Sequence, residues 1–179
     1  MPKWKDRVCG KRRGAIQEYL EFLLAKWLTF GENKNPERRG FVCSLVHPDT
    51  RELLMPTFYV GDVDLKTAFE CGFIHLEKGA RLLDCPNDCT SANSASPEPK
   101  KLLFHQRQYA GGIRCDTKPL LVLTSALPWE GDQSIGVGLG DWFGAISPGR
   151  CEHIADESGD STFMRFIKYC NEPASAIRA

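Results

Sequence analysis

The stretch LLVLTSALPWEGDQSIGVGL, residues 120–139, is the part of the sequence that decides the fold. It opens with the most continuous apolar run of the chain, Leu120 to Ser125, which is typical of a central β-strand. A turn at Gly131 and Asp132 follows, and apolar residues then alternate with glycine from Ile135 to Leu139. We therefore predict a hairpin in which 135–139 is the strand that returns beside 120–125.

The N-terminal third predicts a helix followed by a second hairpin. Apolar residues recur at steps of three and four from Gly14 to Phe30, which is typical of an amphipathic helix. Two β-rich runs, 41–46 and 53–60, flank a turn that contains proline and aspartate. Pro56 lies within the second run, and it places that strand at an edge of the sheet because proline cannot donate a ladder hydrogen bond.

Helices are also predicted in the middle and at the end of the chain. Asp62 or Asp64 can cap a helix that Gly72 interrupts, with a second short helix over 74–83. Residues 84–100 are almost wholly small, polar or proline, so we expect a long loop there and a strand over 102–109. The pair 160–161 can cap a last helix with Phe163, Phe166, Ile167 and Cys170 on one face.

These elements predict an α+β fold. A basic, mobile arm spans 1–13, and a single domain with a mostly antiparallel central sheet flanked by helices spans 14–179. The chain has 179 residues with 23 basic and 23 acidic side chains, so no net field draws it to nucleic acid. No run is apolar enough to span a membrane and no signal peptide is recognisable, so we expect a soluble, cytoplasmic protein with mostly reduced cysteines.

Few side chains carry a chemical signature. The glycine-rich run 136–140 fails the dinucleotide-binding pattern at Asp141, and we expect no cofactor. The stretch 151–160 holds Cys151, His153 and Asp156, which could hold a divalent cation, but a solvated loop before a helix cap explains these side chains better. We therefore predict no metal.

The order of the predicted elements resembles a GAF domain. The resemblance rests on the leading helix 15–30, the hairpin 41–60, a helical middle, and above all the strand-like segments 121–128 and 135–139. It implies a central antiparallel sheet, a ligand pocket between the sheet and crossing loops, or a dimerising helix face. A small-molecule sensor is then the expected function, with no catalysis, and Tyr109, Ser125, Trp129 and Trp142 are the residues that we expect at the ligand.

Two other functions stay open. Some single-domain relatives in that family are free methionine sulfoxide reductases, and Cys115 before the central strand resembles their cysteine, with Cys85 or Cys89 as the resolving thiol. The glycine residues around that cysteine are missing here. The other alternative is a homo-oligomeric interaction module, such as a dimer formed through the helix that carries Trp27.

Overall fold

A four-stranded sheet forms the centre of the computed structural model, which describes residues 13–85, 87–91 and 111–172. The strands lie in the order β2-β1-β4-β3, and each neighbouring pair is antiparallel. The fold is therefore α+β with an antiparallel sheet, as the sequence predicts. The strand bounds are Gly40–Val46 for β1, Phe58–Gly61 for β2, Gly112–Arg114 for β3 and Leu121–Ser125 for β4.

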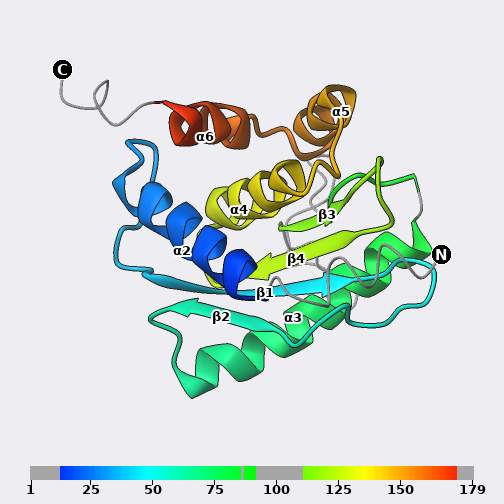
Figure 1. The fold of residues 1–179 in the computed structure, drawn as a ribbon, viewed down its shortest axis with the longest axis horizontal. Helices are drawn as coiled ribbons and strands as arrows, with labels where there is room; N and C mark the ends of the chain where they lie inside the picture. Colours follow the sequence, from blue (N-terminus) through cyan, green and yellow to red (C-terminus); the bar gives the residue numbers. More distant parts are fainter. Residues whose placement is uncertain (1–12, 86, 92–110, 173–179) are drawn as a thin grey trace, which may run out of the picture.

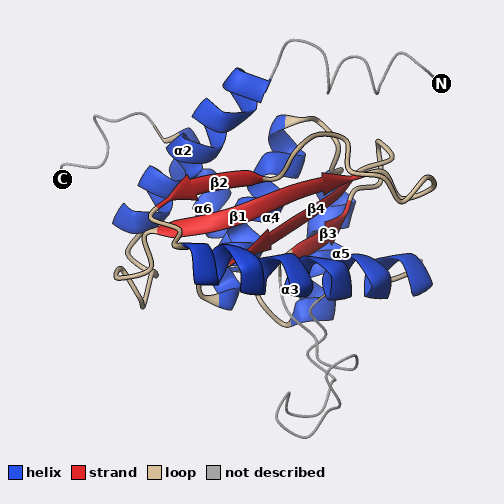
Figure 2. Cartoon of the chain, turned by 90° about the horizontal axis from the view of Figure 1, so that it is seen from below, coloured by secondary structure: helices blue, strands red, loops and turns tan. Residues whose placement is uncertain are grey.

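Helices cover both faces of the sheet (Figures 1 and 2). A single helix, α3, runs beneath one face, while α2 and α4 lie on the other; α6 packs outside α4, and α5 lies on the same side (Figure 1). The helix bounds are Arg13–Thr29 for α2, Leu65–Asp84 for α3, Trp129–Trp142 for α4, Pro148–Ser158 for α5 and Thr162–Asn171 for α6.

Several predicted elements are confirmed. The first amphipathic segment is α2, and the predicted hairpin is the antiparallel pair of β1 and β2. β2 lies at the edge of the sheet, as proline predicts, although it begins only at Phe58 and Leu53 forms an isolated bridge with Val46. The apolar run 121–125 is a central strand between β1 and β3, and the last helix is α6.

The returning strand predicted over 135–139 is wrong, because these residues lie in the middle of α4. Every residue of α4 from Gly131 to Gly140 is buried, since the helix lies between the sheet and α6. A helix that is buried all round has no polar face, so its sequence lacks the period that distinguishes a helix from a strand. One of the two strand-like segments behind the GAF resemblance is thus a helix.

Two further predictions are corrected. The middle of the chain forms one helix of 20 residues, α3, which continues through Gly72 and is capped by Asp64, whose side chain accepts a hydrogen bond from the Thr67 amide. Most of the predicted loop at 151–160 belongs to α5, which Ser147 caps and Pro148 opens. The basic arm up to residue 12, the strand 102–109 and most of the polar loop 84–100 lie outside the described residues.

Trp27, which the sequence suggests for a dimer surface on the first helix, is buried within the chain. Trp27 is only 1% exposed, and its ring packs edge-on against Phe166 of α6, with ring centroids 5.5 Å apart. The Trp27 side chain therefore belongs to the core. None of the helices within the described residues combines the length and the apolar character needed to cross a bilayer.

Candidate functional site

A cavity of about 630 Å³ opens at one end of the sheet. β1 is antiparallel to both of its neighbours, so its first residue lies beside the last residues of β2 and β4. The segments that join these strand ends to the helices, together with one flank of α3, form the walls. The lining residues are Glu37, Arg38, Arg39, Gly40, Asp62, Asp64, Thr67, Glu70, Cys71, Ile74, Lys78, Ser125, Ala126, Leu127, Trp129 and Asp132.

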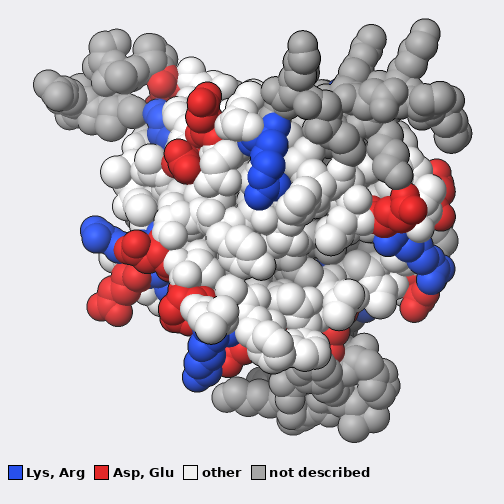
Figure 3. Space-filling view, turned by 60° about the horizontal axis from the view of Figure 1, so that its bottom comes forward, with Lys and Arg blue, Asp and Glu red and all other residues white. Residues whose placement is uncertain are grey.

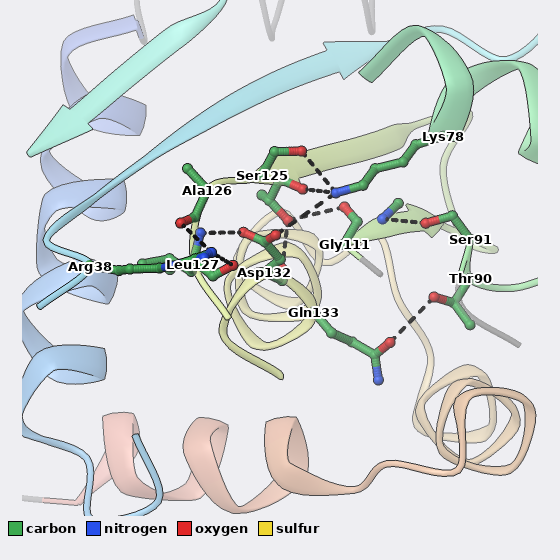
Figure 4. A network of polar contacts seen from close by, with 12 residues as sticks. Arg38, Lys78, Thr90, Ser91, Gly111, Ser125, Ala126, Leu127, Asp132 and Gln133 are labelled. Atoms are coloured by element: carbon green, nitrogen blue, oxygen red, sulfur yellow. Dashed lines mark hydrogen bonds and ion pairs between the residues drawn. The ribbon is translucent and has the colours of Figure 1, made fainter. Parts of the chain in front are cut away.

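A buried lysine forms the floor of this cavity (Figure 4). Lys78 extends from α3, and its ammonium group donates to the backbone carbonyl oxygen of Thr124 and to Oγ of Ser125 at 2.8 Å. The lysine side chain is 2% exposed, so the usual hydration of an ammonium group is absent. Protein oxygen atoms replace that hydration, as a buried cation requires.

The counter-ion of Lys78 comes from the first turns of α4. Oδ2 of Asp132 lies 3.9 Å from Nζ of Lys78, and Oδ1 accepts a hydrogen bond of 3.1 Å from the Leu127 amide. Burial raises the pKa of Asp132 to about 7, while the nearby ammonium opposes that shift. Burial likewise lowers the pKa of Lys78, and the carboxylate opposes it. A carboxyl group that titrates near neutral pH can take up or release a proton for a bound molecule.

The loop between β4 and α4 is held in an unusual conformation beside this pair. Ala126 has φ of +100°, a region that residues with a Cβ atom rarely adopt. Arg38 donates from Nη1 to the carbonyl oxygen atoms of Ala126 and Leu127, at 3.3 Å in each case (Figure 4). Strained backbone conformations cluster at functional sites. They persist only where surrounding contacts hold the chain in place.

A second set of buried contacts anchors α4 to the sheet behind the cavity. Oγ1 of Thr124 donates to the carbonyl oxygen atoms of Gly111 and Asp132, at 3.0 and 2.5 Å. Gln133 donates to Oγ of Ser158 at 2.9 Å and accepts from Thr90. These contacts fix the start of α4, and with it the position of Asp132 (Figure 4).

The structure brings together two of the four residues that the sequence suggests for a ligand. Ser125 and Trp129 both line the cavity, and Trp129 is 47% exposed. Trp142 lies at the other end of α4, where its ring stacks on Tyr19 with centroids 4.7 Å apart. Tyr109 lies outside the described residues.

The three cysteines considered for redox chemistry have unlike surroundings. Cys85 is exposed, while Cys89 and Cys115 are buried. Burial raises the pKa of Cys115 to about 12, and it also raises that of Cys89 although Nη1 of Arg150 donates to its sulfur at 2.5 Å. Raised thiol pKa values are typical of structural cysteines, because the thiolate is the reactive form.

The residues considered for a metal lie on α5. His153 and Asp156 are three residues apart and share one face of the helix, whereas Cys151, two residues before His153, points to another side. In the part of the chain that the structure describes, no three His, Cys, Asp or Glu side chains gather at a point where they could hold a metal ion.

Sequence reasoning missed Lys78, Asp132 and Arg38. Asp132 was assigned to a turn, and Arg38 carries no local motif. Hydrophobicity gives no signal for Lys78, because the most apolar residues of α3 are exposed and the buried face that carries Lys78 is the more polar one.

Comparison of the chain with models of known protein families, with curated proteins and with solved structures gives no match. The site must therefore be interpreted from its own chemistry.

Proposed function

We propose that this protein is a non-catalytic small-molecule-binding module, with the sensor role that the sequence suggests, and that its ligand occupies the cavity between α3 and the β4–α4 loop. The cavity volume of about 630 Å³ lies within the range of pockets that hold metabolite-sized ligands. Its wall combines apolar atoms of Ile74 and Leu127 with many charged and polar groups, so a polar or charged ligand suits it better than an apolar one.

The buried Lys78–Asp132 pair carries the proposal. An ion pair in the interior contributes little net stability, because removing both charges from water costs about as much as their attraction returns. An apolar pair of similar volume would hold α3 to α4 at least as well. The pair instead lies where a ligand that enters the cavity meets a charged donor, a carboxyl group and the Ser125 hydroxyl together.

The rim of the cavity favours a ligand with a positively charged group. Four carboxylates line it, those of Glu37, Asp62, Asp64 and Glu70, against the guanidinium groups of Arg38 and Arg39. The half-exposed ring of Trp129 adds an aromatic face that attracts cations. A small polar molecule with an amino or guanidinium group fits this combination best.

Native mass spectrometry tests the proposal. The full-length protein is incubated with the low-molecular-weight fraction of a cell extract, exchanged into volatile buffer and weighed intact. We expect a retained small molecule on the wild-type protein, and loss of that molecule in Ile74→Trp, because the larger ring fills the cavity.

A matched variant separates cavity filling from general damage to the helix. Leu83 is half-buried on the same helix but lies on its other flank, so Leu83→Trp should retain the ligand. Equal retention by Ile74→Trp and the wild type would place the ligand elsewhere and contradict the proposal.

A further inference from the structure

Helix α3 turns its more apolar face away from the protein. The residues that it buries include the polar His75 and Lys78. Four large apolar side chains face solvent instead: Leu65 is 88% exposed, Phe69 69%, Phe73 49% and Leu76 72%. An amphipathic helix that packs only within its own chain shows the opposite arrangement.

The exposed stripe continues onto the neighbouring edge of the sheet. Leu53 and Tyr59 are each 54% exposed, and an apolar groove of about 390 Å³ lies between them and α3. The face of the molecule that carries α3 is uncharged over most of its centre, with the charged side chains gathered around the rim (Figure 3). An apolar centre within a polar rim is the usual anatomy of a protein interface.

Gly72 lies in the middle of this stripe, and packing within the chain does not explain it. Among the described residues, a Cβ atom built at this position would meet no atom within 4 Å outside the nearby backbone of α3 itself. Glycine in the interior of a helix is unfavourable relative to alanine, and it is useful chiefly where another backbone approaches closely. The side that Gly72 leaves open lies on the exposed stripe, so the glycine leaves room there for the close approach of a partner helix.

We propose that α3 is a homodimer interface, in which two copies of this chain pair their α3 helices antiparallel about a two-fold axis near Gly72 and Phe73. The stripe is nearly symmetric about that point, with Phe69 and Leu76 on either side. The axis places Phe69 of each copy against Leu76 of the other, so the same patch serves both copies, as a two-fold interface requires.

The size of the patch fits a dimer. At the exposed fractions given above, and with about 150–250 Å² for an aromatic side chain, the six side chains present an apolar area on the order of 700 Å². A stable interface buries about 800 Å² on each partner, and monomers rarely expose apolar patches of more than a few hundred Å². The ligand cavity lies on the other flank of α3, so this inference does not depend on the proposed function.

Sedimentation velocity of the full-length protein over a concentration series tests the interface. We expect the wild type to reach twice the chain mass of 20.1 kDa. Phe69→Gln and Leu76→Gln should each raise the dimer dissociation constant at least about tenfold, because each loses a central apolar contact. Met164→Gln is the matched control: this side chain is 44% exposed on α6, on the opposite side of the molecule, and its loss should leave the dissociation constant unchanged.

Gly72→Ala separates the interface from the stability of the chain. Alanine favours the helix and meets no neighbour within the chain, so the melting temperature of the dilute monomer should rise by about 2–4 °C. The same methyl group should hold the two helices apart and raise the dissociation constant. A wild type that stays monomeric at all concentrations, or a dimer unaffected by all three α3 variants, would overturn the proposal.

Discussion

At the scale of single residues, burial lowers the pKa of two side chains of α3 that point toward the sheet, His75 and Lys78. Nδ1 of His75 lies 2.9 Å from Oγ of Ser44, and its Nε2 is buried with no hydrogen-bond partner among the described residues. Burial, reinforced by the nearby Lys78 ammonium, lowers the pKa of His75 to about 3. The native protein therefore keeps this ring neutral at pH values where the unfolded chain protonates it.

This difference predicts a pH-dependent effect of His75→Gln. Below about pH 6.5 the unfolded chain binds a proton that the native state does not, so the wild type loses stability as the pH falls. Asp132 acts in the opposite direction over the same range, and for that reason the variant is compared with the wild type. When the pH falls from about 7 to about 5, the wild type should therefore lose about 2 kcal/mol of its free energy of unfolding relative to His75→Gln.

Urea denaturation at the two pH values measures that change. His153, which is exposed on α5, provides the matched control in His153→Gln. An identical pH dependence in His75→Gln and the wild type would show that His75 is protonated in the native protein.

The Lys78–Asp132 pair predicts strongly unequal effects of single and double substitutions. Lys78→Met leaves a buried carboxylate without its cation, which should cost about 3–5 kcal/mol at about pH 8. The cost should be smaller at about pH 5. Burial raises the pKa of Asp132, so its carboxyl group is protonated there and no longer leaves an unpaired charge in the interior.

Lys78→Met combined with Asp132→Asn should recover most of the lost stability, because asparagine is neutral and still accepts from the Leu127 amide. Chemical denaturation of the three variants measures the coupling. Additive effects of the two substitutions would contradict a direct interaction between these side chains.

At the scale of elements, the glycines of α4 decide how closely this helix packs. A Cβ atom at Gly131 would lie 2.8 Å from the buried ring of Trp27, whereas one at Gly138 would meet Leu23 at an ordinary distance of 3.4 Å. Trp27 of α2 leaves no room for a side chain at Gly131, whereas Leu23 leaves room for a methyl group at Gly138. The same substitution at the two positions should therefore have opposite effects.

We expect Gly131→Ala to destabilise the protein by about 1–3 kcal/mol through overpacking. Gly138→Ala should stabilise it by up to about 1 kcal/mol, because alanine favours the helix. Thermal unfolding of both variants gives the comparison. If 131–140 were part of a hairpin rather than a helix, Gly138→Ala would carry no helix-propensity gain, and this difference in sign would vanish.

Helices α3 and α4 show where prediction from the sequence ends. The amphipathic α2 and α6 and the strands β1 and β4 follow from local periodicity, because each has one buried face or is wholly apolar. The fully buried α4 has no such signal, and glycine at every second position imitates a strand. In α3 the most apolar face points outward, so a choice based on hydrophobicity alone selects the wrong face and overlooks Lys78.

At the scale of the whole molecule, the antiparallel topology assembles the candidate site. Arg38 before β1, Lys78 in α3 and Asp132 in α4 are far apart in the sequence, and they meet because the start of β1 lies beside the end of β4. The sequence indicates Ser125 and Trp129 as neighbours of a ligand, but it cannot supply the partners that only long-range pairing brings to them. Fold class was predictable from patterns, whereas the site depends on tertiary contacts.

The most direct test of the central claim is an NMR titration of isotope-labelled full-length protein with the low-molecular-weight fraction of a cell extract. If the cavity binds a ligand, the amide signals of Ser125, Ala126 and Leu127 should shift together with those of Thr67 and Cys71, which line the same wall. The signals of Gly72 and Gly79, on the other flank of α3, should stay in place. Shifts confined to that other flank, with the β4–α4 loop unchanged, would contradict a small-molecule site beside Lys78 and Asp132.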